Sequence, residues 1–397
     1  MSHRPIARSP DLAQLLADGY NLSVKGGHLV VRDIPYVNTA KLIQRGVLIT
    51  PLNMTGGVAG TPVDHTMYFA GEYPCDQHGN PLEAIRNNSN TVELAPGLSA
   101  DHYFSAKPPK GNYDDYHHKF VTYAALISAH AQALDASAVP NPGGFVPASD
   151  EGDSVFHYMD TASPRAEIVA ITAKLERRKV VIIGLGGTGG YVLDQVAKTP
   201  VEEVHLYDGD TFKQHNAFRA PGAASVKDLE QQPEPLKVHY FAQMYGHMRK
   251  GIVAHPSYVT AENIDELRDA DFVFLCIDDG AAKEMIVRSL EAFDISFIDA
   301  GMGIYRQNSA LAGILRVTTS TPSRRTHVWE NRRISFAKPD DENDYNRNIQ
   351  VADLNALNAI LAVIRWKKLW GFYVDLEREF HSTYTIDGNT IDNEDSE

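Results

Sequence analysis

The sequence predicts an α/β protein with a mainly parallel sheet, and three features carry this prediction. Val180–Ile183 is an apolar, mostly β-branched run that leads straight into Gly184-Leu185-Gly186-Gly187-Thr188-Gly189. Phe272–Ile277 is a second continuous apolar run, typical of a strand buried on both faces. Asp208 ends a third strand candidate and lies 24 residues after Gly184, the first glycine of the turn. A Rossmann-type site places its ribose-binding carboxylate at about this distance. The sheet is therefore expected to be Rossmann-like.

The chain has 397 residues, which is long enough for two domains and a large core. Residues 135–153 are rich in Pro, Gly, Ser and Ala and form the best linker candidate. We therefore expect a smaller N-terminal α+β domain over residues 1–150 and the α/β domain over residues 151–397.

The N-terminal domain is predicted from local patterns. Ser9-Pro10-Asp11 has the form of a helix start, with Pro at the first helical position. Lys25-Gly26-Gly27 lies between two apolar stretches and indicates a hairpin. Apolar residues at helical spacing predict a helix over Tyr116–Leu134.

The second domain is expected to begin with a helix over Thr161–Leu175 and to continue into the glycine-rich strand. Asp387–Glu397, the acidic C-terminal end, is expected to fray. Further helices are predicted over 236–248 and 354–370, and further strands over 252–259, 295–299 and 311–319.

Composition excludes several classes of protein. The formal net charge of −14 argues against a general nucleic-acid or membrane-surface binder. The two cysteines, Cys75 and Cys276, form no Cys-x-x-Cys, so neither a cysteine zinc site nor a disulfide framework is expected. No apolar run reaches about 18 residues, and the N-terminus has no signal-peptide core, so a cytoplasmic protein is expected.

Polar residues gather at the ends of successive predicted strands. These residues include an arginine, a lysine and more than one carboxylate. A hydride-transfer site does not need this set around the cofactor phosphates. A site that cleaves a triphosphate does, because cations neutralise the phosphate charge and a carboxylate holds Mg²⁺. A nucleoside triphosphate is therefore favoured over NAD. The residues concerned are Asp208, Asp210, Asn216, Arg219, Lys237 and Asp278.

These motifs resemble those of the ThiF/MoeB/ubiquitin-activating adenylyltransferases. Beside the glycine-rich turn, Asp208-Gly209-Asp210 is similar to the family's Asp-x-Asp, and His215–Arg219 to its Ser-Asn-Leu-x-Arg. Cys276–Asp279 is similar to its Cys-x-Asp-Asn, with Asp279 where Asn is usual. The resemblance covers roughly residues 161–327. The whole chain resembles bacterial ThiF-family proteins that carry an N-terminal domain of unknown function and occur with ubiquitin-like conjugation genes.

The resemblance implies roles for individual residues. Asp208 would accept hydrogen bonds from the ribose, and Asp278 would hold Mg²⁺. Arg165 would be the arginine that precedes the fold and acts in the partner subunit, although an exposed helix charge is an equal interpretation. The nucleotide would be bound by Gly184, Gly186, Gly187, Gly189, Asp208, Asp210, Asn216, Arg219 and Lys237, with Arg219 and Lys237 also catalytic.

The resemblance implies ATP-dependent activation of a ubiquitin-like carrier protein by adenylation of its C-terminus. It also implies a homodimer, with a conjugating enzyme as a further partner, no nucleic acid and no membrane. The N-terminal domain would recruit the carrier or that partner. The alternatives are a sulfur-carrier adenylyltransferase, an NAD-dependent oxidoreductase and an inactive scaffold that keeps the fold.

The family's thioester-forming cysteine has no match, because no cysteine follows Cys276. Cys276 is expected to be a packed core residue inside its strand. A hydroxyl within residues 318–321 could conceivably accept the acyl group as an oxyester, although these residues are better interpreted as strand and turn. We therefore expect no thioester in the second domain.

Overall fold

The computed structural model describes residues 6, 8–143, 154–158, 160–166, 168–230, 233–336 and 349–396, apart from the side chains of residues 164 and 165. The chain divides into two compact units. Unit 1 comprises residues 1–154 and 158–173, and unit 2 comprises residues 155–157 and 174–397. Within the described residues, no helix is both long and apolar enough to cross a membrane.

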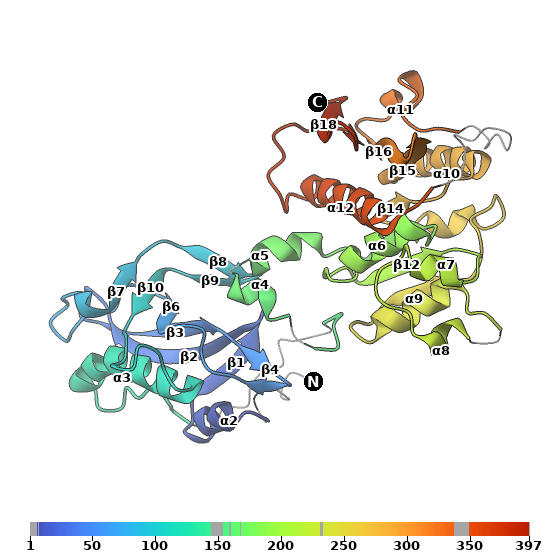
Figure 1. The fold of residues 1–397 in the computed structure, drawn as a ribbon. Helices are drawn as coiled ribbons and strands as arrows, with labels where there is room; N and C mark the ends of the chain where they lie inside the picture. The colour runs from blue at the N-terminus through green and yellow to red at the C-terminus, as the bar shows by residue number, and fades with distance from the viewer. Residues whose placement is uncertain are drawn as a thin grey trace. The chain divides into compact units, whose positions relative to one another are not determined.

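Unit 1 is built on a six-stranded antiparallel sheet with the order β1-β2-β3-β6-β10-β7 (Figure 1). Its helices α2 and α3 pack against one face of this sheet through a shared apolar core. The strands are β1 (Asn21–Lys25), β2 (His28–Val37), β3 (Ile43–Pro51), β4 (Met54–Thr55), β5 (Val58–Ala59), β6 (Thr66–Ala70), β7 (Arg86–Asn88), β8 (Val92–Ala95), β9 (Leu98–Ala100) and β10 (His102–Ser105). The helices are α2 (Pro10–Ala17), η1 (Glu83–Ile85), α3 (Tyr116–Leu134), α4 (Ala162–Arg165) and α5 (Val169–Thr172).

In unit 1, the hairpin and the long helix predicted from local sequence patterns are present in the structure. Gly26 and Gly27 have φ of 52° and 70°, which suits glycine, and they join β1 to β2 as the expected hairpin. The helix predicted from apolar spacing is α3, with the bounds expected. In contrast, the single helix expected over 161–175 is wrong: α4, α5 and the 3₁₀ turn η2 (Ala173–Leu175) are three short pieces.

Unit 2 is a Rossmann-like α/β unit with an eight-stranded sheet, order β13-β12-β11-β14-β15-β16-β17-β18. The five strands from β13 to β15 in this order run parallel, and the pairs from β15 to β18 are antiparallel. The strands are β11 (Lys179–Ile183), β12 (Glu203–Tyr207), β13 (Ile252–His255), β14 (Phe272–Leu275), β15 (Phe297–Gln307), β16 (Ala310–Ser320), β17 (His381–Thr385) and β18 (Thr390–Glu394).

Helices cover both faces of this sheet. One apolar core joins the sheet to α6, α9 and α12, and the other joins it to α10 and η3. The helices are α6 (Gly187–Val196), α7 (Gln214–Ala217), α8 (Val226–Leu229), α9 (Lys237–Gly246), η3 (Ile264–Leu267), α10 (Gly280–Ala292), α11 (Thr326–Glu330) and α12 (Ala352–Leu369).

Three expectations are corrected by the strands of unit 2. β14 ends at Leu275, so Cys276 lies beyond the strand, although it still packs against the apolar core as expected. β15 runs on to Gln307 because it pairs with β16 along its whole length. Residues 390–394, expected to fray, form β18, because they pair with β17 at the edge of the sheet.

Candidate functional site

The glycine-rich turn joins the end of β11 to the start of α6. Gly184 has φ of +88°, a left-handed conformation that favours glycine. Its N–H donates to the carbonyl of Tyr207 over 2.8 Å, which ties the turn to β12. A Cβ at this position would lie 2.6 Å from the carbonyl oxygen of Cys276. The turn therefore passes too close to the loop after β14 for any other residue.

Two further glycines are required by close contacts. A Cβ on Gly189 would lie 1.9 Å from the carbonyl oxygen of Gly184, and one on Gly187 would lie 1.9 Å from Nδ2 of Asn355. Gly186, at the N-cap of α6, has nothing within 4 Å of such a Cβ. The turn is thus closed on the protein side and open at Gly186, which suits close approach of a phosphate to backbone N–H groups.

Asp208 fastens the end of β12 to this turn. The residue is 5% exposed, and its Oδ2 accepts a hydrogen bond from the N–H of Leu185 over 2.7 Å. Its Oδ1 accepts one from the N–H of Asp210 over 2.8 Å. The Asp208 carboxylate thus lies at the turn, and its two oxygens hold the turn in shape.

Lys237 brings a cation to the two carboxylates. Its ammonium lies 2.6 Å from Oδ2 of Asp210 and 3.4 Å from Oδ2 of Asp208, and the residue is 6% exposed. Tyr258, which sequence reasoning missed, donates its hydroxyl to Asp210. Burial opposes ionisation of Asp210, but Lys237 and Tyr258 hold its pKa below the ordinary value. The hydrogen bond to Asp210 in turn raises the pKa of Tyr258 to about 12.

Asn216 and Arg219 lie at the short helix α7. The Asn216 side-chain oxygen accepts the N–H of Lys213 over 2.8 Å, which caps the helix, so this buried side chain shapes the loop. The N–H of Arg219 donates to the carbonyl of Asn216 over 3.0 Å. Nε of Arg219 is buried without a hydrogen-bond partner among the described residues. The half-buried guanidinium of Arg219 is therefore available to bind an anion near the glycine-rich turn.

Asn355 on α12 connects these parts and was missed from the sequence. It is fully buried, and its Nδ2 donates to the carbonyl of Arg219 over 3.2 Å. Its Oδ1 accepts the hydroxyl of Thr188 over 3.3 Å. The available signal was a polar residue on the buried face of a helix, repeated one turn later at Asn358. One side chain thus links the start of α6, the Arg219 loop and α12.

The segment after β14 carries the predicted metal ligand. Asp278 is exposed and follows the strand end, as expected. Asp279 caps α10, with Oδ1 accepting the N–H groups of Ala281 and Ala282 over 3.0 Å each. Burial raises the pKa of the Cys276 thiol to about 12, so it is no ready nucleophile. In the described part of the chain, no group of three or more His, Cys, Asp or Glu side chains is arranged to hold a metal alone.

Two further sequence candidates are Arg165 and the hydroxyls of residues 318–321. The side chain of Arg165 lies outside the described residues. Thr318, Thr319 and Ser320 are at most 1% exposed within β16, so their hydroxyls could not reach a carrier.

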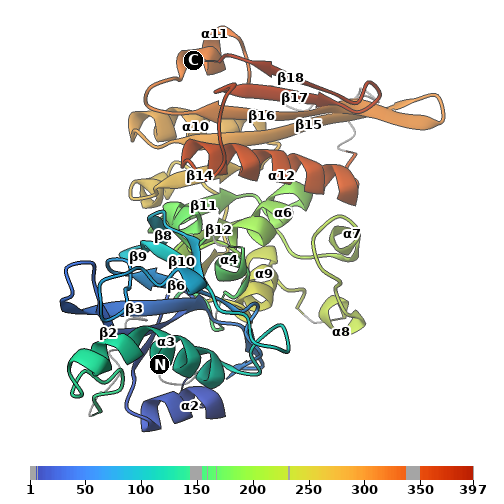
Figure 2. The same ribbon diagram turned by 90° about the vertical axis from the view of Figure 1, so that its left-hand side faces the viewer.

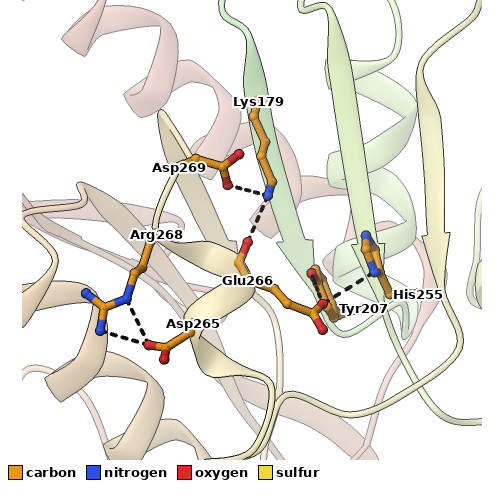
Figure 3. A pocket seen from close by; sticks show the side chains of 7 residues that line it. All are labelled: Lys179, Tyr207, His255, Asp265, Glu266, Arg268 and Asp269. Carbon is orange, nitrogen blue, oxygen red and sulfur yellow. Dashed lines mark hydrogen bonds and ion pairs between the residues drawn. The ribbon is translucent and has the colours of Figure 1, made fainter.

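A hollow of about 570 Å³ lies elsewhere in unit 2 (Figure 3). Its charged side chains already pair with one another: Lys179 lies 2.6 Å from Asp269, and Arg268 lies 2.8 Å from Asp265. Tyr207 donates its hydroxyl to Glu266 over 2.9 Å. None of the site residues predicted from the sequence lines this hollow.

Comparisons with known proteins identify the families that the two parts of the chain match. Residues 163–352 match the family model described as the ThiF family. These residues form a ThiF family domain. Residues 10–161 match DUF6791, a domain of unknown function. A search of curated proteins gives no match.

Solved structures similar to the chain include PaaA and the E. coli protein MccB. PaaA is 15% identical with a TM-score of 0.43, over 58% of this chain and 75% of that one. MccB with MccA is 16% identical with a TM-score of 0.42, over 59% and 66%. MccB with ATP is 17% identical with a TM-score of 0.40, over 59% and 67%.

Proposed function

We propose that the ThiF domain binds ATP and adenylates the C-terminal carboxylate of a ubiquitin-like carrier protein. The observation that carries this proposal is Lys237, a nearly buried ammonium held by Asp208 and Asp210 beside the glycine-rich turn. A dinucleotide site has no need of a cation there, whereas a polyphosphate does. The Arg219 guanidinium adds a second cation from the neighbouring loop.

The chemistry requires positioning more than acid–base catalysis. A carboxylate oxygen of the carrier attacks the α-phosphorus of ATP, the bond to the β-phosphate oxygen breaks, and pyrophosphate leaves. The carboxylate is ionised at neutral pH, so no protein base is needed. Arg219 and Lys237 bind and orient the phosphates and offset the charge that develops on the leaving group.

Magnesium fits the donors at the strand end. Mg²⁺ is usually bound by one or two carboxylates together with substrate phosphates rather than by an all-protein cage. The exposed carboxylate of Asp278, with no three-ligand cluster among the described residues, matches that pattern. Bound Mg²⁺ would supply charge neutralisation at the phosphates.

The proposal includes a cytoplasmic homodimer in which Arg165 of one subunit serves the other's site, and a conjugating enzyme as a further partner. Transfer of sulfur to a carrier begins with the same adenylation, so it is the second candidate. An inactive scaffold would keep the fold without pyrophosphate release.

Calorimetry and pyrophosphate exchange test the proposal. The chain is expected to bind Mg-ATP and not NAD. With a candidate carrier, it should exchange pyrophosphate into ATP. Asp278→Ala should reduce exchange by a hundredfold or more, on the order of the loss for one transition-state charge contact. Asp265→Ala, an exposed carboxylate lining the other hollow, is the matched control. Binding of NAD without any response to Mg-ATP would contradict the proposal.

A further inference from the structure

We propose that Tyr258 is a positioning residue of the nucleotide site: it fixes Asp210 and, through it, directs the ammonium of Lys237 toward the phosphates of ATP. This inference rests on the proposed function, because it says what keeps the Lys237 cation in a productive place. Tyr258 belongs to none of the sequence motifs that predicted the site.

Asp210 holds Lys237 at both ends. The backbone N–H of Lys237 donates to the carbonyl oxygen of Asp210 over 2.9 Å. At the other end of the side chain, the Lys237 ammonium lies 2.6 Å from Oδ2 of Asp210. Figure 2 shows α9, which begins at Lys237, beside β12. A rotation of the Asp210 carboxylate would therefore move the ammonium with it.

The carboxylate of Asp210 depends on a hydrogen bond to keep its orientation. The side chain is 52% exposed, so packing does little to hold it. Asp208 fixes the backbone, since its Oδ1 accepts the N–H of Asp210 over 2.8 Å. Oδ1 of Asp210, the oxygen that does not face Lys237, accepts the hydroxyl of Tyr258. This contact fixes the rotation of the carboxylate, because hydrogen bonds to an ionised acceptor are strong and directional.

The loop after β13 holds the backbone of Tyr258 in place. Nδ2 of Asn263 donates to the carbonyl of Tyr258 over 3.0 Å, and its Oδ1 accepts the N–H of Thr260 over 2.7 Å. The next residue, Val259, is buried in the core on this face of the sheet. Tyr258 itself is 60% exposed. A ring that buries so little area contributes little to folding, so we assign its role to the hydroxyl.

Gly209 lets the ring reach Asp210. A Cβ at position 209 would lie 2.9 Å from both Cε2 and Cζ of the Tyr258 ring. The ring therefore lies directly against the backbone of Gly209, where a larger residue would displace it. Gly209 is also the residue between Asp208 and Asp210, so the ring lies across the segment that joins the two carboxylates.

Tyr258→Phe removes the hydroxyl and keeps the ring. Its Kd for Mg-ATP, measured by calorimetry, should rise about tenfold, the size of one charge-assisted hydrogen bond. The Kd for adenosine, which has no phosphate, should not change, because Lys237 acts on the phosphates. Tyr384→Phe on β17 is the matched control, since it removes a hydroxyl that donates to Asn389 over 2.9 Å. An equal loss for both ligands would indicate a general defect and would overturn the inference.

Gly209→Ala tests the same contact without changing Tyr258. The new Cβ should displace the ring, so the hydroxyl leaves Asp210 and the affinity for Mg-ATP falls as in Tyr258→Phe. The double variant should lose no more than either single variant, because the same hydrogen bond is lost in all three. Gly246→Ala is the control, since an added Cβ there has nothing within 4 Å. Additive losses would show that the two residues act separately and would contradict the proposal.

An NMR titration of the Asp210 carboxyl group detects the contact without any ligand. Burial raises the pKa of Asp210, but the hydrogen bonds from Lys237 and Tyr258 hold that pKa below its ordinary value. In Tyr258→Phe the pKa of Asp210 should rise, because a donor that favours the ionised form is gone. On acidification, Asp210 should then release Lys237 at a higher pH than in the parent. An unchanged titration of Asp210 would overturn the assigned hydrogen bond.

The outcomes separate this inference from the proposed function. If the parent protein fails to bind Mg-ATP, the proposed function is wrong, and the inference fails with it. If the parent binds Mg-ATP and Tyr258→Phe binds it equally well, only the role of Tyr258 is wrong. A tenfold loss that is confined to Mg-ATP, together with the raised pKa of Asp210, would support both.

Discussion

At the scale of single residues, the site depends on contacts between side chains far apart in sequence. Asn355 lies against Gly187, accepts from Thr188 and donates to the Arg219 carbonyl. A buried amide with both ends hydrogen-bonded stabilises one arrangement, because losing a partner leaves a desolvated polar group. We infer that it positions Arg219 relative to the glycine-rich turn.

Gly187→Ala should therefore weaken both the fold and Mg-ATP binding. The new Cβ would meet the buried amide at 1.9 Å, so Asn355 must move. A loss of about 1–3 kcal/mol in the free energy of unfolding is expected, as for overpacking. Asn355→Ala alone should also destabilise the protein. The double variant has no such clash. Its loss in the free energy of unfolding should therefore be smaller than the sum of the losses in the two single variants. Strict additivity in denaturant titrations would show that the two residues do not interact.

His381 makes the folding stability of unit 2 depend on pH. It is 5% exposed, and its Nδ1 lies 3.0 Å from the Thr318 hydroxyl. Burial, helped by Arg333 and Arg316, lowers its pKa to about 4, so the folded state keeps the ring neutral. The contribution of neutral His381 to the free energy of unfolding is therefore fully present above the unfolded pKa of about 6.5. It is lost as the pH falls toward 4, because the unfolded state then binds a proton that the folded state does not.

His381→Asn should flatten the stability curve over that pH range. The parent should lose on the order of 2–3 kcal/mol through this group between pH 6.5 and 4, at 1.36 kcal/mol per pKa unit. Urea titrations at several pH values measure this, with His239→Asn, an exposed histidine, as the control. Identical slopes for the parent and His381→Asn would contradict the assignment.

At the scale of elements, the C-terminal strand β18 shows how tertiary pairing overrides composition. Its sequence is polar and acidic, and all of its residues are exposed. It nevertheless pairs with β17 along its length. Arg333 binds Glu394, and its Nε lies 2.7 Å from Asp395, so the excess of negative charge is what anchors the strand.

Arg333→Gln should release β18. The variant loses the two charge-assisted contacts of the Arg333 guanidinium. Because this side chain is only 19% exposed, solvent screens the contacts little, and the free energy of unfolding should fall by about 1–2 kcal/mol. Amides 390–394 should exchange faster with deuterium. Arg332→Gln, on the exposed neighbouring arginine, should change neither quantity. Unchanged exchange in Arg333→Gln would mean that backbone pairing alone holds the strand.

At the scale of the whole molecule, the chain has two units with separate cores and different sheet types. The ThiF domain carries the candidate site in unit 2, and the DUF6791 match at residues 10–161 covers most of unit 1. α12 keeps Ile360 and Ile364 exposed one turn apart, at 41% and 37%. Exposed apolar side chains on an otherwise packed helix favour a subunit interface.

We predict a homodimer that uses this face of α12. Light scattering at micromolar concentration should give twice the chain mass of 43.8 kDa. Ile360→Asp with Ile364→Asp should shift the protein to the monomer, since burying two charges at an interface is costly. Leu134→Asp, an exposed leucine at the end of α3, is the control. A monomeric mass for the parent would contradict the prediction and the action of Arg165 in trans.

The sequence by itself determined the glycine-rich turn, the Asp208 position and the strand before Asp278. These are local patterns: an apolar run, a glycine at positive φ and a carboxylate at a strand end are encoded within a few neighbouring residues. The ThiF resemblance rests on the same short motifs, and the family match confirms it.

Only the tertiary structure decided which distant residues meet. Asn355 reaches Gly187, and Arg333 fixes β18, each across a long stretch of chain. No spacing rule links such positions, because their proximity follows from strand order and helix packing. The length of β15 was missed for the same reason: its outer half is a strand only because β16 folds back beside it.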